Sequence, residues 1–147
     1  MQRFAFRLER VLQWQIKVCH LAEEELRLAR LAVSETDAAV MRLKSDCLAI
    51  EHDLLNRNLI ASPDLKSLAR HRVKAAQDER SLQLRKQTQL QVVEDRRTRL
   101  SSERNRLRLI EKLRERAARE HSIAVERELE ALALESHLSR RVTAAHL

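Results

Sequence analysis

The fold is decided by the stretch LQWQIKVCHLAEEELRLARLAVSETDAAVMRLKSDCLAIEHDLL, residues 12–55, which carries a seven-residue apolar repeat. One position of the repeat is apolar throughout and holds Leu12, Cys19, Leu26, Val33, Val40, Cys47 and Leu54. The position three residues later holds Gln15, Ala22, Ala29, Thr36, Leu43, Ile50 and Arg57. This spacing is that of the a and d positions of a coiled coil. Because a straight helix drifts by about 20° per heptad, the strict repeat predicts a left-handed supercoil against a partner helix.

The chain turns once. It contains one proline and no glycine in 147 residues, although glycine is the usual residue of tight turns and helix C-caps. Asn56 and Asn58 are tolerated C-cap residues, and Ser62-Pro63-Asp64 has the composition of a helix start, with Ser62 as N-cap and Pro63 at the first helical position. We therefore expect a first helix at about 3–56 and a turn at about 57–62.

The second half has a less regular repeat. Val93, Leu100 and Leu107 are seven apart, and a second frame holds Ile110, Ala117, Ala124, Ala131 and Leu138, so the change of frame predicts a stutter. Between residues 66 and 90 the pattern is weak. We expect a short helix at about 64–79 and a long helix at about 82–141, because one uninterrupted helix would overhang the first.

These features predict an all-α fold with one coiled-coil domain over residues 1–147. A short connection between long amphipathic helices makes them antiparallel neighbours. The expected architecture is a long antiparallel two-helix coiled-coil hairpin, with a short extra helix after the turn as a variant of it. Cys19 and Cys47 occupy a positions, where we expect them to pack as small apolar side chains.

A thin helical seam offers no deep pocket and no glycine-rich loop, so we expect a protein that is not an enzyme. The chain has no nucleophile–base pair and no Cys/His ligand spacing, which leaves no catalytic, metal or cofactor residue to assign. It also has no apolar run of about 18 residues and no secretory signal, and this predicts a cytoplasmic protein.

The net charge of +7 comes from residues 66–116, where 16 Lys/Arg face seven Asp/Glu. This segment contains a run of arginines at positions 96, 97, 99, 104, 106 and 108. Three roles are open for the run: a solvated helix face, a surface for an acidic protein, and a phosphate-contacting stripe for nucleic acid. Aromatic side chains for base stacking are absent there, and Glu94, Asp95 and Glu103 interrupt the run, with Glu103 spaced to pair with Arg106.

The three aromatic residues, Phe4, Phe6 and Trp14, all lie within the first 14 residues. Two roles are open for them. They form a capping cluster against the C-terminal segment, or they form a docking tip, because aromatic and arginine side chains are favoured interface anchors.

The opening FAFRLERVLQWQIKVCHLAEEELRLA, residues 4–29, resembles the start of the flagellar export protein FliJ family, an aromatic-x-Phe-Arg-Leu-x-x-Val-Leu block followed by a Glu/Ala/Leu-rich helix. The stretch IEKLRERAAREHSIAVERELEALALES, residues 110–136, is similar to the second helix of that family. The resemblance implies a stalk-like antiparallel coiled coil of the type III export apparatus, without a cofactor. The related stalk proteins of virulence secretion systems share these features.

The resemblance also implies partners: the ring of the export ATPase, the cytoplasmic domain of the export gate, and export chaperones. Through them the protein would be peripheral to the inner membrane. The candidate residues for the ATPase ring are Phe4, Phe6, Arg7, Leu8, Val11, Trp14, Arg127 and Arg140, and those for the export gate are Leu65, Leu68 and Arg72. The alternatives are a basic coiled coil that binds nucleic acid and a scaffold that forms intermolecular coiled coils.

Overall fold

The computed structural model describes residues 4–57 and 61–145, with side chains up to residue 140. It contains two α-helices, α1 (Glu9–Leu55) and α2 (Ser62–Ala145), and no strand in the part that it describes. The protein is an all-α helical hairpin, as the sequence predicts. None of the described helices is long and apolar enough to cross a membrane.

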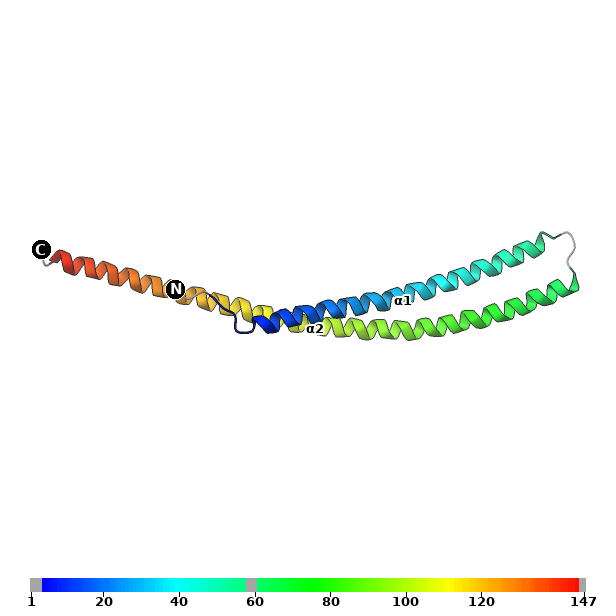
Figure 1. Cartoon of the computed structure of the whole chain (residues 1–147), viewed down its shortest axis with the longest axis horizontal. Coiled ribbons are helices and arrows are strands. Elements are labelled where there is room, and N and C mark those ends of the chain that lie inside the picture. The colour runs from blue at the N-terminus through cyan, green and yellow to red at the C-terminus, as the bar shows by residue number, and fades with distance from the viewer. Residues whose placement is uncertain (1–3, 58–60, 146–147) are drawn as a thin grey trace. The chain divides into compact units, whose positions relative to one another are not determined.

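By packing, the chain divides into two compact units, whose boundary falls inside both helices. The first unit is formed by Met1–Cys19 with Ser102–Leu147, and the second by His20–Ser101. In the second unit α1 and α2 run side by side in opposite directions (Figure 1). Its core consists of Ala22, Leu26 and Leu100, with Val93 packed against them.

Three ion pairs fix the antiparallel register of the second unit. Glu51 bonds Arg72 at 2.8 Å, Lys44 bonds Glu79 at 3.1 Å, and Asp37 bonds Lys86 at 2.6 Å. From one pair to the next, the residue of α1 lies seven positions earlier in the chain and the residue of α2 lies seven positions later. The heptad predicted for α1 is confirmed, because Leu12, Cys19 and Leu26 are buried and the other a residues up to Leu54 are half-buried. Among the d residues, Gln15, Ala22 and Thr36 are buried, whereas Arg57 is exposed beside the turn.

The expected division of the second half into helices 64–79 and 82–141 is wrong, because α2 is one helix from Ser62 to Ala145. The weak pattern near residue 80 reflects polar side chains at positions that face α1. Glu79, Lys86 and Gln89 are half-buried, and each bonds a residue of α1. Thr36 Oγ1, for example, bonds Gln89 Oε1 at 2.8 Å.

The predicted stutter is wrong as well. From Glu79 to Ile110, the residues of α2 that face α1 follow one another at alternating steps of three and four, and this row passes through Val93, Arg96, Leu100, Glu103 and Leu107 without interruption. Up to Ala117, the two frames seen in the sequence are therefore the two core positions of one heptad, whereas Ala124, Ala131 and Leu138 of the second frame are exposed.

The start of α2 lies one residue earlier than predicted. The carbonyl of Ala61 accepts hydrogen bonds from the backbone N–H of Asp64 (3.0 Å) and Leu65 (3.4 Å), so Ala61 is the N-cap and Ser62 the first helical residue. Alanine has no side-chain acceptor, but the Asp64 carboxylate accepts from the Ala61 N–H at 3.4 Å, which is half of a capping box. At the end of α1, the Asn56 N–H donates to the His52 carbonyl at 3.1 Å, and Asn58 lies outside the described residues.

Candidate functional site

The N-terminal aromatic segment is partly used inside the molecule. The ring of Phe4 meets that of His121 edge-on, with centroids 5.5 Å apart. Phe4 and Phe6 are half-buried, and with Ala5, Glu9 and Arg114 they line a cavity of about 470 Å³. A 3.5 Å ion pair between Glu9 and Arg114 closes the same contact. Two roles were open for these aromatics, a capping cluster against the C-terminal segment and a docking tip. Phe4 makes the contact with α2 that the first role requires.

The remaining candidates in this segment are exposed. Trp14 is 62% exposed, Val11 42% and Leu8 38%, and Arg7 is exposed beside them. Val11 and Trp14 are three residues apart in α1, so they lie on one side of the helix. Exposed aromatic and apolar side chains together with an arginine are the residue types that often anchor a protein interface.

Arg127 and Arg140 do not join this group. Phe4 meets α2 at His121, and Arg127 and Arg140 follow about 9 Å and about 28 Å further along the helix axis at 1.5 Å per residue. Both are exposed, as is every residue from 126 to 140. The expectation that they share one site with the aromatics fails, because α2 is a single helix that continues beyond its contacts with the N-terminal segment.

Near the turn the structure brings together all three residues predicted for the export gate. Leu65, Leu68 and Arg72 line one small cavity of about 80 Å³, with Glu51, Leu54, Leu55 and Asp64. Arg72 Nε donates to Glu51 Oε1 at 2.8 Å, and both residues line this cavity. Sequence reasoning missed the contribution of α1, since it placed the site on α2 alone.

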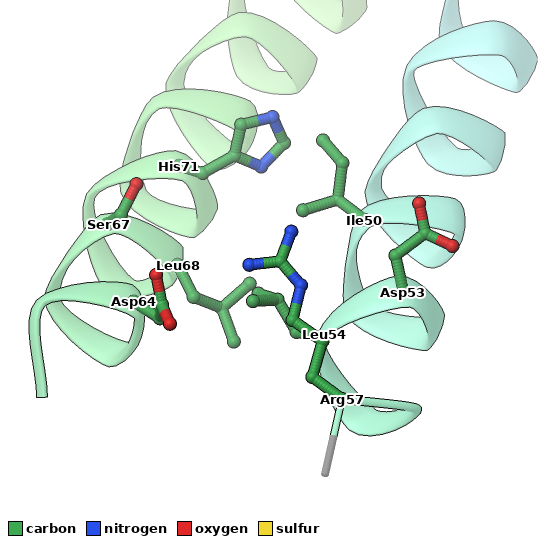
Figure 2. A pocket seen from close by; sticks show the side chains of 8 residues that line it. All are labelled: Ile50, Asp53, Leu54, Arg57, Asp64, Ser67, Leu68 and His71. Carbon is green, nitrogen blue, oxygen red and sulfur yellow. The ribbon is translucent and has the colours of Figure 1, made fainter. Parts of the chain in front are cut away.

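A second cavity of about 360 Å³ opens beside it, between the last turn of α1 and the first turns of α2 (Figure 2). Its lining consists of Ile50, Asp53, Leu54, Arg57, Asp64, Ser67, Leu68 and His71. Figure 2 shows the side chain of Arg57 reaching back between the helices. The cavity is lined by acidic and basic side chains together with Leu54 and Leu68, so it can contact a peptide segment or a helix of another protein. The signal in the sequence was Arg57, an arginine at a d position.

The arginine run 96–108 is largely occupied by carboxylates of the chain itself. Arg96 and Arg99 both donate to Glu25 Oε2 of α1, at 2.7 and 2.9 Å. Arg106 bonds Glu103 at 2.8 Å, as the spacing predicts. The run therefore serves helix pairing in part, and this disfavours a continuous phosphate-contacting stripe.

Glu103 lies at the centre of a buried polar contact. Gln15 is 3% exposed, and its Nε2 donates to Glu103 Oε2 at 2.6 Å and to the Glu103 carbonyl at 3.3 Å. Among the described residues, no group of three or more His, Cys, Asp or Glu side chains could hold a metal ion.

Comparison with known proteins assigns no relative. None of the protein-family models, curated proteins or solved structures matches this chain.

Proposed function

We propose that the protein is a non-enzymatic, stalk-like coiled coil of a flagellar type III export apparatus. It would engage the ring of the export ATPase and the export gate or chaperones. The proposal rests on the resemblance of residues 4–29 and 110–136 to the FliJ family. The structural observation that supports it most is the exposure of Arg7, Val11 and Trp14 in the N-terminal segment, which the contact of Phe4 with His121 joins to α2.

Two surfaces suit two partners. The exposed residues of the N-terminal segment would contact the ATPase ring, and the cluster of Leu65, Leu68 and Arg72 would contact the export gate. The protein would then act in the cytoplasm, at the inner membrane through its partners. We expect no nucleic-acid partner, since Glu25 already holds Arg96 and Arg99.

The test uses the full-length chain and a purified flagellar export ATPase. Trp14→Ala should reduce the stimulation of ATP hydrolysis about tenfold or more, because Trp14 is 62% exposed and one aromatic anchor often dominates an interface. Met41→Ala is the matched control, since Met41 is an exposed apolar residue of α1 outside both surfaces (70% exposed). Equal stimulation by the two variants would contradict the assignment of the N-terminal surface.

The second surface is tested on the same proteins. Leu65→Asp should weaken binding to the cytoplasmic domain of the export gate and leave ATPase stimulation unchanged, because Leu65 is 56% exposed and belongs to a different unit from the N-terminal segment. If no stimulation of the ATPase occurs and duplex DNA binds tightly at about 0.15 M salt, the export function is wrong and the nucleic-acid alternative is favoured.

A further inference from the structure

The C-terminal part of α2 carries a second apolar stripe. Its large residues are all exposed: Leu109 (63%), Leu113 (51%), Ile123 (48%), Leu134 (65%) and Leu138 (59%). They extend over about 30 residues, or about 45 Å at 1.5 Å per residue. A long row of exposed apolar side chains on a soluble helix indicates a surface that another molecule covers.

This stripe is distinct from the side of α2 that meets α1. The N-terminal segment contacts α2 at Glu103, Arg114 and His121. At 3.6 residues per turn, the stripe lies roughly a third of a turn around the helix from these contacts. A further helix can therefore lie along it while α1 keeps its place.

The stripe has a two-fold pattern. From Leu109 its positions advance by four, three, four and three to Ile123, and from Ala124 they advance by three, four, three and four to Leu138. The pattern therefore reads the same in both directions around a point between Ile123 and Ala124. Reversal pairs Leu109 with Leu138, Leu113 with Leu134, Arg116 with Ala131, Glu120 with Arg127, and Ile123 with Ala124.

We propose that the stripe is the interface of an antiparallel homodimer, in which α2 of one copy lies along α2 of a second copy. A two-fold interface uses the same patch on both subunits, so each position must suit its own mirror position. Here the four outer layers pair leucine with leucine, and the two central layers pair Ile123 with the small Ala124. The layers between them pair Arg116 with Ala131 and Glu120 with Arg127.

Charge favours the same arrangement. The Glu120 carboxylate, which pairs with Arg116 of its own helix at 3.0 Å, would also face Arg127 of the second copy, once on each side of the dyad. Residues 126–135 carry four Glu and one Arg, and they would lie against residues 112–121, which carry four Lys/Arg and two Glu. In a parallel pair, the acidic segment 126–135 of one chain would instead lie beside the same acidic segment of the second chain. Complementary flanking charges are the usual determinant of helix orientation in coiled coils.

A second copy also explains why the helix persists. Every residue from 126 to 140 is exposed in the single chain, and isolated helices of this length are marginal in water. Pairing along the stripe supplies the packing that α1 does not provide there.

The experiment is sedimentation equilibrium of the full-length chain over a range of concentrations. The wild type should give twice the chain mass of 17.2 kDa. Leu134→Asp should raise the dissociation constant by about 100-fold or more, because the substitution occurs twice in the dimer. Leu132→Asp is the matched control, since Leu132 is equally exposed (60%) but lies off the stripe, and it should leave the constant within about threefold.

A charge exchange tests the orientation. Glu120→Arg alone and Arg127→Glu alone should each weaken the dimer, and the double variant should restore it, because the opposed pair is then rebuilt with reversed signs. A wild type that stays monomeric at the highest concentration overturns the proposal and points to a helix of another protein as the occupant. A dimer that Leu134→Asp leaves intact overturns it too, as does a double variant no tighter than the single ones.

Discussion

The buried contact between Gln15 and Glu103 should set a large part of the stability of its unit. Gln15 is 3% exposed and Glu103 9%, so both polar groups have lost most of their water. The carboxylate keeps two partners, the Gln15 amide at 2.6 Å and Arg106 at 2.8 Å. Gln15→Leu keeps the approximate volume but removes the amide, and the carboxylate then faces an apolar side chain.

The expected cost follows from the chemistry of the contact. A hydrogen bond to a charged group contributes about 1.5–3 kcal/mol, and an unsatisfied buried partner costs at least as much as the lost bond. Gln15→Leu should therefore lower the free energy of unfolding by about 2–3 kcal/mol. Glu103→Leu should cost about 1–3 kcal/mol, because it removes the carboxylate acceptor and leaves the buried amide only the longer bond to the backbone carbonyl of residue 103, at 3.3 Å. The double variant should be close to the wild type, since replacing both polar groups by apolar ones removes the penalty.

The measurement is urea unfolding followed by circular dichroism, at one fixed protein concentration because association adds to the apparent stability. Gln13→Leu is the control, since Gln13 is exposed and its amide donates to Glu9 of its own helix at 3.2 Å. This substitution should change stability by less than about 0.5 kcal/mol. A coupling energy below about 0.5 kcal/mol in the double-variant cycle would refute the claim that the two side chains act as a buried pair.

Three further predictions concern the second unit and the start of α2. Leu26→Ala should lower the free energy of unfolding by about 2–5 kcal/mol, because Leu26 is 7% exposed in the core, whereas Leu28→Ala (55% exposed) should cost less than about 0.5 kcal/mol; urea unfolding of both compares them. Glu25→Gln should cost about 1 kcal/mol in dilute buffer and less in about 1 M salt, because it weakens two half-exposed ion pairs that salt screens, and no salt dependence of the difference would contradict this. Asp64→Ala should cost about 0.5–1 kcal/mol and speed amide exchange in the first turn of α2, measured by hydrogen exchange, while Ser62→Ala should leave both unchanged.

The sequence predicts those parts of the fold that a single helix can encode. The repeat from Leu12 to Leu54 is visible because apolar residues occupy the a positions without exception, and their burial confirms it. Pro63 marks the turn because its ring fixes φ and suits the first helical turn. The predicted start is wrong by one residue because the side-chain acceptor of the cap is Asp64, three residues after the N-cap, whereas the N-cap residue Ala61 has no side-chain acceptor.

The continuity of α2 could not be predicted in the same way. Positions such as Glu79, Lys86 and Gln89 look outward-facing when α2 is considered alone, since they are polar. They face inward because their partners stand on α1, and Lys44 and Thr36 are examples. Likewise, the cavity near the turn could be predicted only in part, since half of its lining comes from the other helix. The continuity of α2 and the cavity near the turn both depend on which residues of the two helices contact each other, and the sequence pattern of one helix does not contain this.

The charged positions also solve a problem that the apolar repeat leaves open. A seam of period seven packs nearly as well after a slip of one heptad, because each a residue meets another a or d residue of similar size. The ion pairs do not tolerate the slip: moving the helices by seven residues in one direction places Glu51 opposite Glu79 and Lys44 opposite Lys86, and the opposite slip places Lys44 opposite Arg72. Each surface pair contributes about 0.5 kcal/mol or less, but a slip loses three attractions and gains two repulsions, so together they separate the registers by about 2 kcal/mol. That difference favours the native register roughly thirtyfold, and it comes from residues that contribute little to the burial of apolar surface.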